Sequence, residues 1–284
     1  MTPEIENILL SAAIFASRKA GNAIIDIYNS DFTIEQKEDN SPLTLADKKS
    51  NEEIIEYLKS APEMPDFPVL SEEGKTIPYD DRKKWEYFWL IDPLDGTKEF
   101  IKRNGEFTVN IALINKGRPV IGVVYVPVKN ILFFSSESTG AYRIILKEED
   151  SEDFDKILSK GTIDDVLSRG EKLPIKKSGT DTGSEFTIAA SRSHMNKETE
   201  NFINDLKSKH ENVSLVSAGS SIKLCLVAEG SADIYPRLGP TMEWDTAAAH
   251  AVVNGAGKHV FKYDKNEELK YNKTNLKNPW FVVR

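Results

Sequence analysis

WLIDPLDGTKEF, residues 89–100, is the most informative stretch of this 284-residue chain. An apolar run that ends at Ile91 is typical of a buried strand, and it leads directly into Asp92 and Asp95. A tight turn accounts for Gly96 but not for two carboxylates, because uncompensated charge at the end of a buried segment is costly. The stretch therefore indicates a site that uses both acids.

Two further acids also stand at the ends of predicted elements. Glu72 follows the strand-like segment FPVL at 67–70, and Asp245 follows GPTMEW at the start of a predicted helix. Such ends are where α/β folds form ligand crevices, and convergence there would raise the acids' pKa values unless cations lie among them. Oxygen ligands without a nearby His or Cys set favour Mg²⁺ or Mn²⁺ over Zn²⁺. Since several acids can hold more than one ion, the pattern points to metal-assisted phosphoryl transfer.

Each acid also has a simpler interpretation, which the sequence leaves open. Asp95 and Gly96 form a common turn pair, Glu72 can be an exposed surface acid, and Asp245 can stabilise a helix N-terminus. Two related motifs fit less well. DPLDGT lacks the alternating acids of an EF-hand calcium loop, and it has one residue too many between its acids for the haloacid dehalogenase-like phosphatases.

The composition narrows the class of protein and its partners. A net charge of −8 argues against polymeric nucleic acid, which needs clustered Lys and Arg, but leaves room for a small nucleotide. Cys225 is the single cysteine, so no intrachain disulfide forms, and its apolar setting predicts a core thiol. The segment MTPEIENILL carries acids where a signal peptide has basic residues, and no apolar run approaches about 18 residues. We therefore expect a cytoplasmic protein without an integral membrane segment, while peripheral membrane association stays open.

The pattern of the chain divides it into three parts. Residues 1–146 predict helices at 3–28, capped by Thr2, and at 44–58, followed by a meander of antiparallel hairpins from FPVL, YFWLI, FTVNIALI, PVIGVVYVPV and NILFFSS. Residues 147–173 are rich in charge and predict a solvated loop or short surface helix, inserted between two halves. Residues 174–284 alternate strands at 186–191, 213–217 and 232–236 with helices near 197–209, 221–229 and 244–254. This alternation indicates an α/β layer.

Three motifs of the chain resemble the markers of the inositol monophosphatase superfamily of metal-dependent, lithium-sensitive phosphatases, and they occur in the same order as in that superfamily. They are SEEG at 71–74, DPLDGT at 92–97 and EWDTAAAHAVVNGAG at 243–257, and the similarity spans nearly the whole chain. DNSPLTLAD, DPLDGTKEFI and GPTMEWDTAAAHAV are most similar to the CysQ-like branch, the 3'(2'),5'-bisphosphate nucleotidases. The resemblance implies a layered α/β sandwich of the inositol monophosphatase and fructose-1,6-bisphosphatase type. In that fold a mixed, largely antiparallel sheet meets a second αβ lobe at the metal site.

The same resemblance implies roles for the motif residues. Mg²⁺, with Mn²⁺ as a substitute, would be bound as about two or three ions by Glu72, Asp92, the Leu94 carbonyl, Asp95 and Asp245. The attacking water would be oriented by Thr97 paired with Asp47. From the sequence alone, TLAD favours a helix capped by Thr44 with Asp47 in its first turn, and the two roles are compatible. Gly96 lets the backbone approach a phosphate, and N–H groups around Gly96 and Thr97 can hold its oxygens. No Ser or Cys nucleophile is needed, so we expect no covalent phosphoenzyme.

The substrate is indicated by a second set of residues. Positions that hold the nucleotide in the bisphosphate nucleotidases match Ser191, His194, Ser220, Lys223 and Arg237, beside Gly96, Thr97 and Asp245 of the metal-side motifs. Cations beside N–H groups at a helix start suit a second phosphate. His194, Lys223 and Arg237 also fit ordinary surface positions, and that alternative stays open.

We therefore expect Mg²⁺-dependent hydrolysis of the 3'-phosphate of adenosine 3',5'-bisphosphate to AMP, with the sulfated analogue as a related substrate. By resemblance, this step recycles a by-product of sulfate assimilation. Inositol phosphates or other sugar phosphates are the alternative substrates, and fructose 1,6-bisphosphate is a more distant one. A catalytically silent protein that binds metal and nucleotide for regulation is the alternative outside enzymes. A monomer and a homodimer are both compatible with the sequence.

Overall fold

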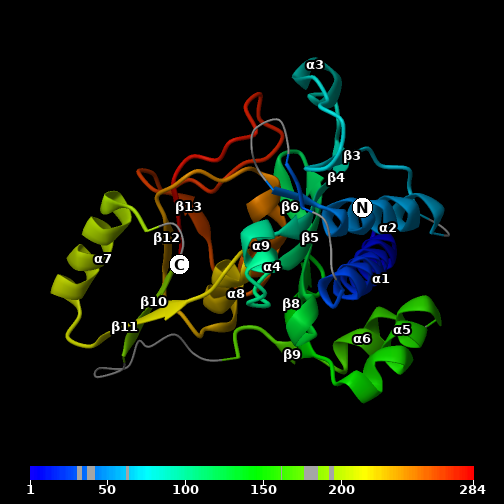
Figure 1. The fold of residues 1–284 in the computed structure, drawn as a ribbon. Helices are drawn as coiled ribbons and strands as arrows, with labels where there is room; N and C mark the ends of the chain where they lie inside the picture. The colour runs from blue at the N-terminus through cyan, green and yellow to red at the C-terminus, as the bar shows by residue number, and fades with distance from the viewer. Residues whose placement is uncertain (31–33, 37–41, 62–63, 161, 176–184, 192–194) are drawn as a thin grey trace.

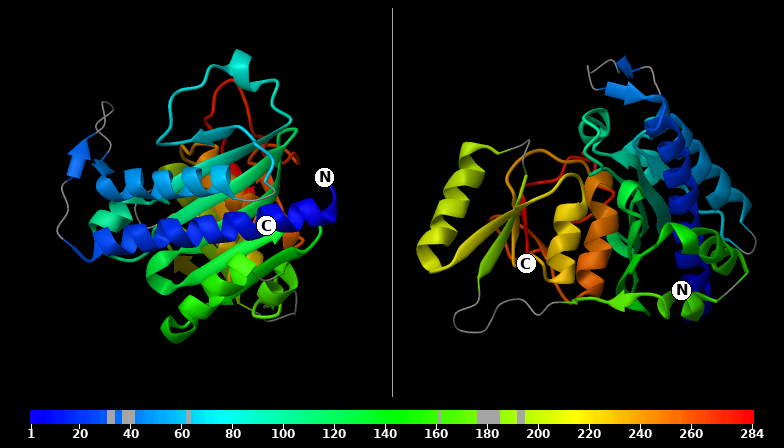
Figure 2. Two further views of the ribbon diagram at one scale, coloured as in Figure 1. Left: turned by 90° about the vertical axis from the view of Figure 1, so that its right-hand side faces the viewer. Right: turned by 60° about the horizontal axis from the view of Figure 1, so that its bottom comes forward.

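The computed structural model describes residues 1–30, 34–36, 42–61, 64–160, 162–175, 185–191 and 195–284. Figure 1 shows a layered molecule in which helices and sheets alternate. Helices α1 (Pro3–Tyr28) and α2 (Leu45–Ser60) cover one face of a large sheet, and α9 (Trp244–Gly255), with α8 (Ile222–Glu229) beside it, covers the other. Smaller sheets lie beyond α8 and α9 (Figure 2). The predicted layered α/β architecture is confirmed.

The large sheet carries the acidic motifs at one end. In spatial order its strands are β3 (Val69–Ser71), β4 (Tyr87–Asp95), β5 (Thr108–Asn115), β6 (Arg118–Val126), β7 (Ile131–Ser136), β8 (Gly140–Ile145) and β9 (Glu171–Lys172). Neighbours from β4 to β9 are antiparallel, as the predicted meander requires, whereas β3 runs parallel to β4. The hairpin prediction is wrong for β3 because residues 72–86, including the short helix α3 (Tyr79–Arg82), return the chain to its starting edge. This parallel pairing puts the C-terminal ends of β3 and β4 side by side.

Both faces of the large sheet are buried, which explains the nearly continuous apolar sequence of its strands. On β4, Trp89 and Ile91 join the core under α1, and Phe88 and Leu90 join the core under α9. Helices α2 and α9 contact β4 directly and therefore hold it from opposite sides.

Helix α1 begins as predicted, with Pro3 in its first turn and the Thr2 hydroxyl accepting a hydrogen bond from the Ile5 N–H at 3.4 Å. Among the described residues it is the one helix whose length and hydropathy would suffice to cross a membrane. Its apolar side chains are instead packed in the core, where Leu9, Ile14 and Ile24 are fully buried.

Residues 147–173 contribute to this core. They form η2 (Glu148–Asp150), α5 (Ser151–Lys160) and α6 (Ile163–Leu167), and Phe154 and Val166 are buried among side chains of α1. The Arg18 guanidinium, 1% exposed, donates to Asp155 at 2.7 and 3.1 Å. The prediction of a solvated loop is wrong, whereas its alternative, a short surface helix, holds for α5 and α6. The apolar side of these helices packs in the core, and the charged residues of the segment conceal that side in the composition. The division of the chain at 147–173 stays a prediction.

The second half alternates strands and helices as predicted. Its elements are β10 (Phe186–Ala190), α7 (Lys197–Lys209), β11 (Val213–Ser217), α8, β12 (Tyr235–Arg237), α9, β13 (Val260–Lys262) and β14 (Phe281–Val283). Strands β10 and β11 are parallel, and β12, β14 and β13 form an antiparallel sheet in that order. Cys225 on α8 is fully buried, as expected of a core thiol. A short hairpin, β1 (Ile34–Gln36) with β2 (Pro42–Thr44), precedes α2.

Candidate metal and phosphate site

The site begins where β4 leaves the regular ladder of the sheet. Asp92 still pairs with Asn110 of β5, and the pairing resumes only at Asp95, opposite Thr108. The irregular stretch between the acids is anchored by Ser50 of α2, whose hydroxyl donates to the Pro93 carbonyl at 2.7 Å. Irregularities of this kind re-aim side chains at the rim of a sheet. The extra residue in DPLDGT thus lets both acids face the same end of the sheet.

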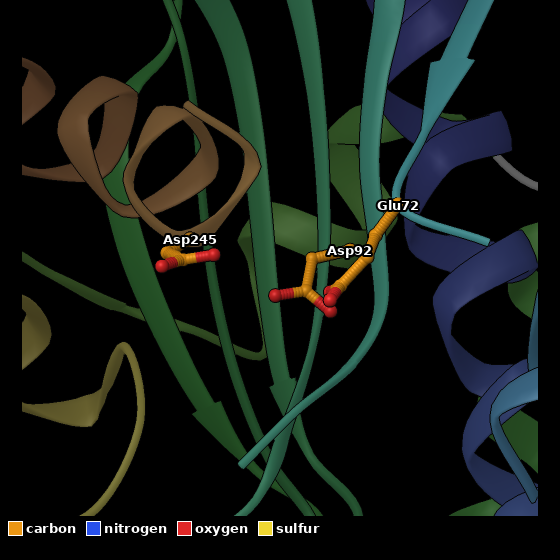
Figure 3. Close-up of side chains that lie close together, drawn as sticks. All are labelled: Glu72, Asp92 and Asp245. Carbon is orange, nitrogen blue, oxygen red and sulfur yellow. The ribbon is translucent and has the colours of Figure 1, made fainter. Parts of the chain in front are cut away.

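Three of the predicted acids converge there. Glu72 directly follows β3, and its N–H donates to the Ile91 carbonyl at 3.1 Å, which brings it beside Asp92. Asp245 lies in the first turn of α9 and approaches from the other face of the sheet. Each of the three offers a carboxylate oxygen that lies within 4.8 Å of the other two. Figure 3 shows the Glu72 and Asp92 carboxylates directed toward one another and Asp245 facing them from α9.

Asp95 and Leu94 stand beside this group and line the same cavity of about 380 Å³. One oxygen of Asp95, Oδ2, accepts a hydrogen bond from the Ser221 hydroxyl at 3.0 Å. Asp245 is fixed in a similar way, since its Oδ2 accepts from the Met242 N–H at 2.9 Å. These bonds hold both carboxylates in place.

The acids repel one another strongly. Burial, and then the charges of Glu72, Asp95, Asp245 and Asp47, raise the pKa of Asp92 well above its ordinary value. Burial, followed by the Asp95 charge, raises the pKa of Asp245 from 3.8 to about 8. Burial also raises the pKa of Asp95, although Lys223 and the Ser221 hydroxyl counteract part of that shift. The arrangement lacks enough positive charge to keep all the acids ionised without a cation among them.

The donor set suits Mg²⁺. The described residues that line the cavity include carboxylates and hydroxyls but neither His nor Cys. Three carboxylate oxygens within 4.8 Å of one another can share one small divalent ion, and Asp95 and Leu94 lie close enough to the cavity to extend the set. Hard oxygen ligands of this kind are those that Mg²⁺ and Mn²⁺ prefer.

The chain turns sharply beyond the acids. Gly96 has a φ of 94°, and a Cβ at this position would lie 2.2 Å from the Ser220 hydroxyl oxygen. This turn starts the short helix α4 (Thr97–Ile101), and Gly96 and Thr97 both line the cavity. Asp47 is 3% exposed on α2, and its charge contributes to the raised pKa of Asp92. The residues predicted to hold phosphate and orient water are therefore gathered around the acids.

The same cavity is lined by the residues predicted to recognise the substrate. Ser191, Ser220, Lys223 and Arg237 all line it, whereas His194 lies outside the described residues. Lys223 is 4% exposed, and its ammonium donates to the carbonyls of Ala218 at 3.1 Å and Ser220 at 2.7 Å. The alternative that Lys223 is a solvated surface charge is thereby wrong.

The sequence pattern did not indicate several other residues of the cavity. Lys98, Glu99, Asn104, Tyr235 and Thr241 also line the cavity, and Ser221 hydrogen bonds to Asp95 behind it. One neighbour of Ser221 could have been found from the sequence. Asn110 is a polar residue in the otherwise apolar strand FTVNIALI, and a buried polar side chain needs a partner.

A model of the inositol monophosphatase family matches residues 6–279. The chain belongs to the inositol monophosphatase family. Within it, the chain is 41% identical over 270 residues to the 3'(2'),5'-bisphosphate nucleotidase CysQ of Escherichia coli (strain K12), covering 94% of this chain and 96% of that relative. It is 32% identical over 276 residues to the protein of the same name from Haemophilus influenzae, covering 97% and 92% of the two chains.

Two solved structures share the fold. The crystal structure of CysQ from Bacteroides thetaiotaomicron aligns with a TM-score of 0.83 at 50% identity, covering 98% of this chain and 97% of that one. The suppressor protein suhB from Bartonella henselae aligns with a TM-score of 0.70 at 22% identity, covering 97% and 93% of the two chains, a likeness that bears on the fold alone. The family and the fold predicted from the three motifs are confirmed.

Proposed function

We propose that this chain is a Mg²⁺-dependent 3'(2'),5'-bisphosphate nucleotidase, which hydrolyses the 3'-phosphate of adenosine 3',5'-bisphosphate to AMP and inorganic phosphate. The observation that supports the proposal is one cavity lined by two chemically different sets of residues. The first set, called the metal wall, consists of carboxylates from three separate elements, and the second, called the nucleotide wall, includes the cations Lys223 and Arg237. The first suits divalent ions, and the second suits a phosphate that is not hydrolysed. Relatives named as such nucleotidases match nearly the whole chain.

For the metal wall, we assign Glu72, Asp92, Asp95, Asp245 and the Leu94 carbonyl as ligands of about two or three ions, with Mn²⁺ as a substitute for Mg²⁺. When bound, divalent ions in such sites lower the pKa of water and neutralise charge on a transferring phosphoryl group. The contribution of the chain is to hold the carboxylates at short spacing. Asp92 is buried, and its burial restricts that spacing.

The phosphate and the attacking water are placed by the turn after β4. Backbone N–H groups at Gly96 and Thr97 hold phosphate oxygens, since Gly96 leaves room for a close approach. The Thr97 hydroxyl accepts a hydrogen bond from the water and donates to Asp47, which orients the water for in-line attack. No covalent phosphoenzyme forms in this scheme, because water itself attacks phosphorus.

The nucleotide wall distinguishes a bisphosphate from an inositol phosphate. Arg237 lines the cavity, and its buried Nε has no hydrogen-bond partner within the described residues, while Nη2 donates to the Pro240 carbonyl at 3.0 Å. A buried donor without a partner is costly unless a ligand satisfies it. We assign Arg237, Lys223, Ser220, Ser191 and His194 to the ribose and 5'-phosphate of the substrate, with Asp245 reaching from the metal wall.

We further propose that the protein acts in the cytoplasm on a small-molecule substrate, as a monomer or homodimer. A single buried cysteine is typical of reducing compartments. The sulfated analogue of the substrate shares its 3'-phosphate and is expected to be hydrolysed as well.

A substrate panel tests the proposal. Phosphate release is measured from adenosine 3',5'-bisphosphate, its sulfated analogue, inositol 1-phosphate and fructose 1,6-bisphosphate at equal Mg²⁺, with EDTA as the control. We expect the largest kcat/KM for the adenosine bisphosphate and no release in EDTA. A larger kcat/KM for inositol 1-phosphate would assign the cavity to inositol phosphates, and nucleotide binding without phosphate release would indicate a silent regulator.

A further inference from the structure

A chain of hydrogen-bonded side chains lies directly behind the acids. The Thr108 hydroxyl donates to Asn110 Oδ1 at 3.1 Å, and Asn110 Nδ2 donates to Ser221 Oγ at 2.9 Å. Ser221 Oγ in turn lies 3.0 Å from Asp95 Oδ2 and 2.8 Å from the backbone carbonyl oxygen of Asp245. Thr108, Asn110 and Ser221 are each at most 1% exposed. We call these three residues the relay.

The relay has a defined direction. Since the Asn110 carbonyl receives the Thr108 proton, its amide group faces Ser221 and can only donate to it. Ser221 has a single hydroxyl proton, and the Asn110 contact uses an oxygen lone pair. That proton is therefore directed to the acidic side, where Asp95 and the Asp245 carbonyl accept it.

The relay also connects the parts of the fold that carry the metal wall. Thr108 and Asn110 are alternate residues of β5, and they pair with Asp95 and Asp92 across the irregular end of β4. Ser221 immediately precedes α8, and the Asp245 carbonyl lies in the first turn of α9. One hydroxyl thus joins the end of β4 to the starts of α8 and α9, and the acids it contacts lie on β4 and α9.

We propose that Ser221 is a positioning residue, oriented by Asn110, which fixes Asp95 and the start of α9 at one spacing and thereby sets the affinity of the site for Mg²⁺. The inference rests on the proposed function in one respect, that the acids hold the metal. Neighbours that orient metal ligands typically change metal affinity about 10- to 100-fold when they are removed. A role limited to joining α8 to β5 would change folding stability and leave Mg²⁺ affinity unaltered.

Mg²⁺ binding without substrate separates these roles. The full chain is freed of metal with EDTA, exchanged into metal-free buffer and titrated with Mg²⁺ by calorimetry. The proteins are the wild type, Ser221→Ala, Asn110→Ala and the double variant, with circular dichroism as the check of folding. Ser17→Ala is the matched control, because Ser17 is also fully buried but donates to the Ile14 carbonyl within α1.

We expect Ser221→Ala to raise the Kd for Mg²⁺ at least about tenfold, Asn110→Ala to raise it severalfold, and Ser17→Ala to leave it unchanged. Because Asn110 acts through Ser221, the double variant should bind no more weakly than Ser221→Ala alone. An unchanged Kd in folded Ser221→Ala, or in folded Asn110→Ala should Ser221→Ala not fold, overturns the proposal. Additive losses overturn the link between Asn110 and Ser221. Absence of Mg²⁺ binding by the wild type would remove the metal assignment itself and the proposed function with it.

Discussion

Replacing Asp245 by Asn should raise the free energy of unfolding of the metal-free protein. With Mg²⁺ bound, the variant should be less stable than the wild type. Without a cation among the acids, burial and the Asp95 charge raise the pKa of Asp245 from 3.8 to about 8. A carboxyl whose pKa rises on folding holds its proton more tightly in the folded state, so the free energy of unfolding falls as the pH rises through this interval. Asn keeps an oxygen to accept the hydrogen bond from the Met242 N–H at 2.9 Å and removes the charge.

The size of the effect follows from the interval of about four pH units. Each unit is worth about 1.4 kcal/mol, so the limiting penalty at pH 8 is about 6 kcal/mol. We expect about 2–3 kcal/mol instead, since the side chain is half-buried, solvent screens its charge, and Asp92 and Asp95 share the proton.

Urea denaturation in EDTA, followed by circular dichroism at pH 5 and pH 8, measures this difference. Asp245→Asn should unfold at higher urea than the wild type at pH 8, and the gap should shrink at pH 5. Asp264→Asn replaces an exposed acid and is the control; it should leave the urea midpoint unchanged at both pH values. With saturating Mg²⁺ the wild type should unfold at higher urea than Asp245→Asn, because only the wild type gains the full stabilisation of ligand binding. A variant less stable than the wild type at pH 8 in EDTA would refute the argument that the acids repel one another.

Four further substitutions test other parts of the site. Asp92→Asn should lower turnover by orders of magnitude in a folded protein, and near-normal phosphate release would remove its role as a ligand. Thr97→Ala should lower kcat far more than it changes KM, whereas an unchanged kcat would exclude it from water activation. Lys223→Met keeps the buried stem but not the charge, so KM for adenosine 3',5'-bisphosphate should rise, and an unaltered KM would argue for a substrate without a second phosphate. Gly96→Ala should lower the Tm, because φ is 94° and the new Cβ would lie 2.2 Å from the Ser220 hydroxyl oxygen, and a wild-type Tm would contradict this turn geometry.

The sequence alone predicted that Glu72, Asp92 and Asp245 converge, and the reason is physical. Glu72, Asp92 and Asp245 each stand at the end of an element with a clear apolar pattern, and the ends of neighbouring elements meet in layered folds. Those acids do come together. The spacing of DPLDGT, which excludes other phosphatase motifs, is explained by the irregular end of β4 between Asp92 and Asp95.

Features that depend on distant packing were harder to predict. The parallel orientation of β3 is determined by the path of residues 72–86, which carry no periodic pattern. The buried face of α5 rests on Phe154 and Leu158 within a strongly charged segment, so composition concealed it. Ser221 was overlooked because its contacts with Asn110 and Asp95 span more than a hundred residues of sequence.

The fold must hold the acids against their own repulsion, and the residue before Trp244 shows how it does so at α9. Glu243 is fully buried, and its carboxylate accepts from the backbone N–H groups of Asn272 at 2.6 Å and Lys273 at 2.9 Å, and from the Lys273 ammonium at 2.6 Å. Because a buried carboxylate that loses its partner is strongly destabilising, this cluster fixes the start of α9 to the loop at 270–278. Asp245 lies two residues later, in the first turn of α9, so fixing the start of the helix also fixes the position of Asp245. The neighbouring carboxylates Glu243 and Asp245 thus differ: the first has satisfied partners and stabilises the fold, while the second is short of compensating charge, as the proposed role in binding a cation requires.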